Sequence, residues 1–227
     1  MPRPPSAPPL AHTVKVALTG LTGFATLAGL WMHLPAWRRA DAAWLGRIQA
    51  WTPDALTAWA EATTLLGGLP VTIPLALALA AYLWQRNHKP EAIVWSALFV
   101  GGQAVLFGLK LAFSRTRPSA PDLLMRDFSF PSGHAFTAVV LYGAIGYLGG
   151  RRLRTRWARA ALALAVGTVV LAIGGSRLLL RVHYPTDVLG GYLLGIAWLA
   201  LLGVALRRWR PGASRPQPVS SSTRSRC

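Results

Sequence analysis

Residues 186–206 read TDVLGGYLLGIAWLALLGVAL, and after Asp187 this stretch carries no charged side chain. About 20 apolar residues in an α-helix cross the hydrocarbon core of a bilayer, which is about 30 Å thick. A chain inside the bilayer has to satisfy its own backbone hydrogen bonds, so the stretch is expected to be helical. The sequence holds six such segments, of which the fourth is the shortest, and we therefore predict an all-α polytopic membrane protein, a bundle of six transmembrane helices at residues 14–34, 64–85, 91–113, 134–150, 157–176 and 186–206.

The composition favours a membrane protein over a nucleic-acid-binding one. Lys and Arg outnumber Asp and Glu by 24 to 7, and a formal net charge of +17 is one signature of nucleic-acid binding. Hydrophobic residues make up 53% of the chain, however, and only 14% are charged. Because a soluble nucleic-acid module would not contain several long charge-free apolar runs, we predict no nucleic-acid partner. Cys227 is the only cysteine, which excludes an intrachain disulfide and a cysteine-based metal cluster.

The chain is predicted to form one domain over residues 13–207. Residues 1–12 are rich in Pro, and residues 208–227 are rich in Pro, Ser and Arg, so both ends are expected to be disordered. The first apolar run is longer than the core of a typical signal peptide, and no clear small-residue cleavage site follows it. We interpret this run as the first membrane helix.

Residues 35–63 connect the first two predicted spans. Trp37, Trp44, Ile48 and Trp51 recur there at spacings of seven, four and three, which places them on one face of a helix. Tryptophan rings prefer the boundary between a bilayer and water. The pattern therefore predicts an interfacial helix that is anchored by its tryptophans.

Lys and Arg are distributed unevenly between the two sides that six spans define. With the N-terminus inside, 15 of the 24 fall on the inner side, five of them between residues 151 and 159. Because positively charged loops remain in the cytoplasm, we predict that both termini are cytoplasmic. Abundant Ala, Leu and Arg are typical of a GC-rich bacterial genome, which favours the inner membrane of a bacterium.

Three short polar clusters interrupt the apolar pattern, and polar groups near a membrane are costly enough to suggest a function. The alternation of the six spans places all three clusters on the same side, the periplasmic or exterior one. They occupy residues 110–118, 131–134 and 176–187, and their distinctive residues are Lys110, Arg117 and Pro118; Pro131, Ser132, Gly133 and His134; and Ser176, Arg177, His183 and Asp187. Three segments that are distant in sequence are therefore expected to form one site.

The cations and the helix start in these clusters suit a phosphate group. Lys110, Arg117 and Arg177 match a dianion, and the planar guanidinium group of Arg pairs with phosphate oxygens. Ser132 and Gly133 begin the fourth span, where backbone N–H groups and the positive end of the helix dipole favour an anion. We expect these five residues to bind the phosphate.

The two histidines of the clusters supply the chemistry. His183 and Asp187 are four residues apart, so on a helix they share a face. The carboxylate can keep one ring nitrogen protonated and leave the other free to attack phosphorus. His134 is then available to protonate the leaving oxygen and later to activate water. With only five histidines and seven acidic residues, and no cluster with metal-ligand spacing, we predict neither a metal nor another cofactor.

The three clusters resemble the three signature motifs of the type-2 phosphatidic acid phosphatase superfamily, which also includes the vanadium haloperoxidases. All eleven motif positions are present in the family's order. The resemblance implies a helical bundle and metal-independent hydrolysis through a phosphohistidine at His183. It also implies that Asp187 orients this histidine and that His134 is the general acid and base. The phosphate ligands that it implies are Lys110, Arg117, Ser132, Gly133 and Arg177.

Other polar and small residues near the motifs have ordinary interpretations. Three arginines are expected to be boundary residues whose side chains extend toward the interface: Arg115, Arg126 and Arg181. Two loop carboxylates are expected to be solvated: Asp122 and Asp127. Three glycines of the last span are interpreted as helix-packing positions: Gly190, Gly191 and Gly195.

These observations predict a lipid phosphatase. The substrates that the resemblance suggests are undecaprenyl diphosphate, phosphatidylglycerol phosphate and phosphatidic acid. Three alternatives stay open at this point: a phosphatase of soluble phosphate esters, a halogenating enzyme with bound vanadate, and a lipid transporter or scramblase without enzymatic activity. The last does not account for two histidines and an aspartate at the spacing of a nucleophile. The sequence indicates no particular oligomeric state.

Overall fold

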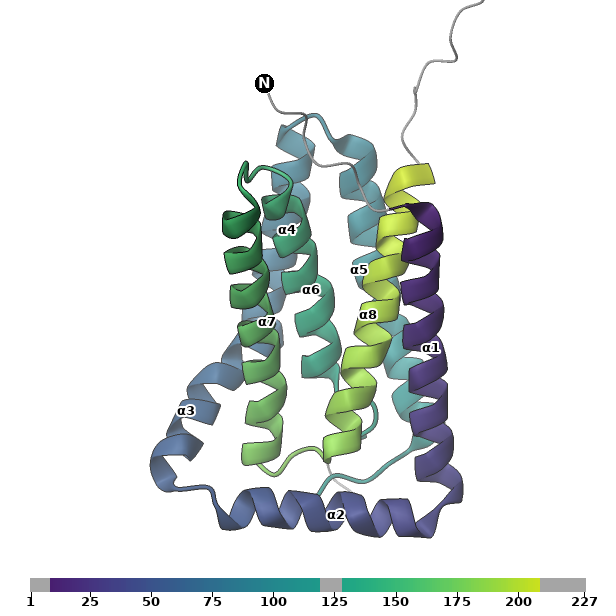
Figure 1. Cartoon of the computed structure of the whole chain (residues 1–227), viewed down its shortest axis with the longest axis vertical. Helices are drawn as coiled ribbons and strands as arrows, with labels where there is room; N and C mark the ends of the chain where they lie inside the picture. The colour runs from purple at the N-terminus through teal and green to yellow at the C-terminus, as the bar shows by residue number, and fades with distance from the viewer. Residues whose placement is uncertain (1–8, 119–127, 209–227) are drawn as a thin grey trace, which may run out of the picture.

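A computed structural model describes residues 9–118 and 128–208, and these residues form an all-α fold (Figure 1). Each long helix coincides with one of the apolar segments of the sequence or with the segment between the first two. The elements are α1 (Leu10–His33), α2 (Pro35–Ala50), α3 (Asp54–Thr64), the 3₁₀ turn η1 (Leu65–Gly67), α4 (Leu69–Gln85), α5 (Lys89–Phe113), α6 (Gly133–Gly150), α7 (Arg156–Leu179) and α8 (Pro185–Arg208).

The long helices run alongside one another, and α2 lies across one end of the bundle (Figure 1). α8 packs against α1 on one side and against α6 on the other, and α6 also contacts α7. Two glycines allow the close approach of α8 to α6: a Cβ atom on Gly191 would lie 2.5 Å from the carbonyl oxygen of Ser132, and one on Gly195 would lie 2.8 Å from Cβ of Val139. This packing brings the first turn of α8 against the first turn of α6, where two of the three motifs lie.

Five segments of the described chain are long and apolar enough to cross a membrane, which confirms the prediction of an all-α polytopic membrane fold. They are Leu10–His33, Asp54–Gln85, Lys89–Phe113, Arg156–Leu179 and Pro185–Arg207. The fourth predicted span, residues 134–150, is helix α6, and this helix is not among the five. α6 has only 18 residues, begins with Gly133 and His134, and buries most of its first half inside the bundle. Its contacts are with protein, so it needs less apolar surface than a helix that faces lipid.

The prediction of a single interfacial helix over residues 35–63 is wrong in detail, because the segment forms two helices, α2 and α3. α2 ends before Pro53, which has no N–H group and restricts the residue before it. Trp44 in α2 and Trp51 directly after it are 58% and 86% exposed, so these two side chains point away from the bundle. The opposite face buries Asp41 and Leu45, and a buried carboxylate was not expected there.

Candidate active site

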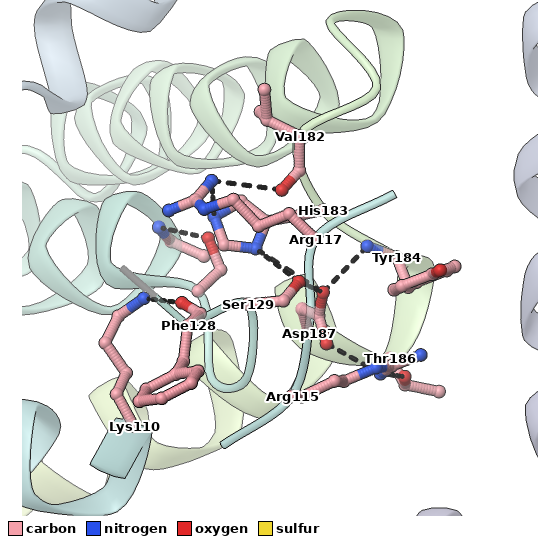
Figure 2. A network of polar contacts seen from close by, with 12 residues as sticks. Lys110, Arg115, Arg117, Phe128, Ser129, Val182, His183, Tyr184, Thr186 and Asp187 are labelled. Atoms are coloured by element: carbon pink, nitrogen blue, oxygen red, sulfur yellow. Dashed lines mark hydrogen bonds and ion pairs between the residues drawn. The ribbon is translucent and has the colours of Figure 1, made fainter. Parts of the chain in front are cut away.

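The three motifs meet at the end of the bundle that α2 crosses. Lys110 lies in the last turn of α5, Gly133 starts α6, and Arg177 lies in the last turn of α7. His183 lies in the connection between α7 and α8, and Asp187 is in the first turn of α8. Tertiary structure thus brings residues of four helices together at the end of the bundle that holds His183, and Figure 2 shows Lys110, Arg117, His183 and Asp187 there.

The His183 side chain is only 1% exposed and lies between a carboxylate and a guanidinium group. Its Nδ1 is 3.4 Å from Oδ2 of Asp187, and its Nε2 is 3.4 Å from Nη1 of Arg117 (Figure 2). Burial lowers the pKa of His183 from its ordinary value to about 4; Asp187 opposes this shift, and the charges of Arg117 and Arg177 add to it. The imidazole is therefore neutral near pH 7, and with the proton on Nδ1 it presents the lone pair of Nε2 toward the cations.

The carboxylate of Asp187 is completely buried and held on both oxygens. Oδ2 accepts hydrogen bonds from the hydroxyl of Ser129 and, at 2.8 Å, from the backbone N–H of Tyr184. Oδ1 accepts from Nη1 of Arg115 at 2.6 Å (Figure 2). A carboxylate with this many donors cannot rotate freely, so the orientation of His183 is fixed from behind.

The interpretation of Arg115 as an exposed boundary residue is wrong. Arg115 is only 6% exposed, and its guanidinium group bridges two buried carboxylates. Nη1 donates to Asp187, and Nη2 donates to Oδ2 of Asp41 at 2.6 Å. The physical reason is that the connection after α5 lies between the start of α8 and α2, so the guanidinium group reaches acceptors on both helices. Arg181, by contrast, is exposed, as the sequence suggested.

The three predicted phosphate cations each donate a hydrogen bond to a protein oxygen. Nη1 of Arg117 donates to the carbonyl oxygen of Val182 at 3.0 Å, next to His183. Nη1 of Arg177 donates to the hydroxyl of Thr64 at 2.6 Å, and Nζ of Lys110 donates to the carbonyl oxygen of Phe128. These contacts orient the positive groups in advance, so little side-chain entropy remains to be lost when an anion binds.

The start of α6 completes the site. Ser132 is the N-cap residue, and its hydroxyl accepts a hydrogen bond from the N–H of Ala135 at 3.5 Å. The N–H of Ser132 donates to the carbonyl oxygen of Asp187 at 2.9 Å, so this N–H is engaged by protein and was not expected to be. Gly133 lies beside Lys110, with 3.9 Å between its would-be Cβ and Cε of the lysine. His134 follows in the first turn and lies against Gly67 of η1.

The structure adds residues to the site that the sequence did not single out: Asp41, Ser129 and Thr186. Thr186 donates from its N–H to Oδ1 of Asp41 at 3.0 Å and from its hydroxyl to Oδ2 at 2.5 Å. One signal for Asp41 was available, because the chain has only seven acidic residues. A carboxylate on a helix otherwise rich in Trp, Ala and Arg is costly unless it is paired, but its partner could not be named from the sequence.

Among residues 9–118 and 128–208, no group of three or more His, Cys, Asp or Glu side chains could hold a metal ion. Asp122, Arg126 and Asp127 lie outside the described residues.

The chain is similar in sequence to a known protein family and to several known proteins. The sequence model of the PAP2 superfamily matches residues 92–211, more than half of the chain, including all three motifs. Phosphatidylglycerophosphatase B from Bacillus subtilis (strain 168) is 29% identical over 150 residues, which cover 65% of this chain and 72% of that protein. Human glucose-6-phosphatase 3 is 36% identical over 84 residues, 34% of this chain but only 24% of that protein.

Two solved structures have a similar fold. The transmembrane PAP2-type phosphatidylglycerolphosphate phosphatase from Bacillus subtilis superimposes with a TM-score of 0.77 at 26% identity, over 88% of this chain and 99% of that one. LpxE from Aquifex aeolicus superimposes with a TM-score of 0.52 at 21% identity, over 74% and 94%, and this likeness concerns the fold alone.

Proposed function

Because the chain belongs to the PAP2 superfamily and is therefore a membrane phosphatase of phosphomonoesters, we propose that it removes phosphate from a membrane lipid with His183 as the covalent nucleophile. The single observation that carries the proposal is the position of His183, which is buried, faces Asp187 with Nδ1 and faces Arg117 with Nε2. A histidine that attacks phosphate requires positive charge near its attacking nitrogen, here Nε2, and a carboxylate near its other nitrogen, here Nδ1.

The proposed reaction has two steps. Nε2 of His183 attacks phosphorus in line, the N–P bond forms, and the bond from phosphorus to the lipid oxygen breaks. His134 donates a proton to that oxygen, so the lipid leaves as an alcohol. A water molecule then loses a proton to His134 and attacks the phosphohistidine, which releases inorganic phosphate and restores both histidines.

In both steps the cations bind the non-bridging oxygens of the phosphoryl group. Lys110, Arg117 and Arg177, together with the first N–H groups of α6 at Gly133, stabilise the negative charge of the transition state. The Nδ1 proton of His183 stays on the side of Asp187, whose negative charge stabilises the imidazolium that forms as Nε2 bonds to phosphorus.

We also propose that the bundle crosses the membrane six times, with α6 as the additional span. The start of α1 and the end of α8 lie at the same end of the bundle (Figure 1), so the number of crossings has to be even. α6 begins at the active-site end and α7 begins at the opposite end, so α6 has to extend over the full length of the bundle. With the excess of Lys and Arg on the side of the termini, this arrangement supports cytoplasmic termini and a site that faces outward.

The membrane position of the site supports a lipid as the substrate, since a headgroup could reach His183 while its tails remain in the bilayer. The likeness to phosphatidylglycerophosphatase B makes phosphatidylglycerol phosphate the first candidate, ahead of phosphatidic acid and undecaprenyl diphosphate. The partial likeness to glucose-6-phosphatase 3 supports a soluble phosphate ester as the second candidate function.

A substrate panel tests the proposal. Purified protein in detergent is offered phosphatidylglycerol phosphate, phosphatidic acid, undecaprenyl diphosphate and glucose 6-phosphate, with and without a chelator, and phosphate release is measured. We expect release from a lipid, resistance to the chelator, and no release by His183→Ala. The matched control is His33→Ala, an exposed histidine at the end of α1 outside the motifs, which should retain full activity. Near-normal turnover by His183→Ala would refute the assignment, and preference for glucose 6-phosphate would favour the second function.

A further inference from the structure

Helix α2 carries a carboxylate that points into the bundle at the active-site end. Asp41 is only 4% exposed, although α2 is otherwise exposed except for Leu45 and a few half-buried positions. Its two oxygens accept three hydrogen bonds: two come from Thr186, through the backbone N–H and the hydroxyl, and one comes from Nη2 of Arg115. Burying a carboxylate is costly unless hydrogen bonds replace those that it makes with water. The three donors supply these hydrogen bonds and hold Asp41 in one position.

Arg115 connects this carboxylate to the one that faces the nucleophile. Nη2 contacts Asp41 and Nη1 contacts Asp187, both at 2.6 Å. The guanidinium group also lies over two aromatic rings, 4.1 Å from the centre of Tyr184 and 4.9 Å from that of Trp31. Packing on these rings and two charged hydrogen bonds leave the group one orientation. The contacts therefore run without a gap from α2 through Arg115 and Asp187 to His183.

The charges of Asp41, Arg115 and Asp187 decide what Asp41 contributes to the reaction at His183. Without Asp41, the full positive charge of Arg115 would act on Asp187 and draw its electron density away from His183. The imidazole becomes positive when Nε2 bonds to phosphorus, and the charges of Arg117 and Arg177 already oppose a further cation nearby. A second carboxylate on Arg115 cancels its charge and leaves Asp187 to stabilise the imidazolium.

We infer that Asp41 and Arg115 are positioning residues for the phosphatase reaction, which set the orientation and the charge of Asp187 and, through it, the reactivity of His183. Neither side chain is placed among the groups that bind phosphate. Their removal is therefore expected to slow the chemical step and to leave substrate affinity nearly unchanged. The inference rests on the proposed role of His183 as the nucleophile.

A purely structural role would look different. If Asp41 only attached α2 to the bundle, its removal would lower thermal stability and the active fraction, but the folded enzyme would form phosphohistidine at the normal rate. The amount of active protein affects the size of a burst, whereas the chemical step affects its rate constant. The rate constant of phosphohistidine formation therefore separates the two roles.

The experiment measures phosphohistidine formation by rapid quench, with phosphatidic acid in detergent micelles, together with kcat, KM and the thermal midpoint. The variants are Asp41→Asn, Arg115→Gln, their combination, and Asp54→Asn as an exposed control at the start of α3. We expect Asp41→Asn to lower the rate constant and kcat by about 10–100-fold, the range for carboxylates that orient ligating histidines. KM should stay within about twofold, as uniform binding is untouched, and Asp54→Asn should match the unchanged protein.

Because Asp41 acts through Arg115, the combined variant should be no slower than Arg115→Gln alone. Multiplying losses in the combined variant, or a normal rate constant in folded Asp41→Asn, would overturn the inference. A His183→Ala arm identifies the other failure: phosphoenzyme in that variant would show that the proposed nucleophile is wrong, whatever Asp41 does.

Discussion

Replacing Arg115 with Met should destabilise the protein strongly, because the change removes the cation between two buried carboxylates. The side chains of Asp41 and Asp187 are 1% and 0% exposed, so neither can be solvated when Arg115 is gone. Breaking a buried ion pair by removing one partner costs about 3–5 kcal/mol. Met retains much of the apolar packing against Tyr184 and Trp31, so the loss reports mainly on charge.

The magnitude converts directly into a thermal shift. For a protein of this length, 1 kcal/mol corresponds to about 2–4 °C in Tm, so we expect a decrease of about 6–20 °C. Unfolding is followed by circular dichroism in detergent micelles at matched protein and detergent concentrations. Adding Asp41→Asn to Arg115→Met removes one of the two uncompensated charges and should recover part of the loss.

The control is Arg38→Met, an exposed arginine on α2 for which we expect a change within about 0.5 kcal/mol. A decrease below about 2 °C for Arg115→Met, less than about 1 kcal/mol on the same scale, would refute the buried ion-pair network. An additional loss in the double variant would show instead that the two hydrogen bonds from Thr186 to Asp41 stabilise the protein more than the uncompensated carboxylate destabilises it.

Three further predictions concern the site itself. His134→Asn should lower turnover of a lipid phosphate by about 10²–10⁴-fold. With an aryl phosphate, whose leaving group needs no acid, the variant should accumulate phosphohistidine, because the second step lacks its general base. Rapid breakdown of the phosphoenzyme would contradict that role. The lowered pKa of His183, about 4, keeps the proposed nucleophile neutral above that pH. Phosphohistidine formation from the aryl phosphate, which does not need the proton of His134, should therefore stay constant, after correction for substrate titration, down to about pH 5 and fall near pH 4; a midpoint near 6.5 would contradict the burial of His183. Protonation favours the unfolded state, so the free energy of unfolding should also decrease as the pH falls from 6.5 toward 4. Gly67→Val should reduce kcat, because a Cβ there would lie 2.5 Å from Cγ2 of Ile173 and 3.0 Å from Cδ2 of His134; full activity in the folded variant would show that the contact is not needed.

The hydrophobic pattern was sufficient for the class of fold. Charge-free runs of about 20 residues can only be helices in a membrane, so α1, α5, α7 and α8 follow from sequence to within a few residues. Two features depend on local and tertiary context. The break between α2 and α3 depends on Pro53, which restricts the conformation of the residue before it. The tryptophan spacing alone predicts one continuous helix across this break. The burial of the first half of α6 depends on its central position between α7 and α8, which no local pattern encodes.

The sequence by itself determined the candidates for binding phosphate and for attacking it, because the motif residues follow the order of the family's signature motifs. His183 and Asp187 are four apart, so their pairing needs only a turn of backbone. Only the tertiary structure decided what stands behind that pair. Asp41, Arg115 and Asp187 are 74 and 72 residues apart and lie on three different segments. A buried charge can be assigned a partner only when the packing of those segments is known, because the cost that forces the pairing arises from burial itself.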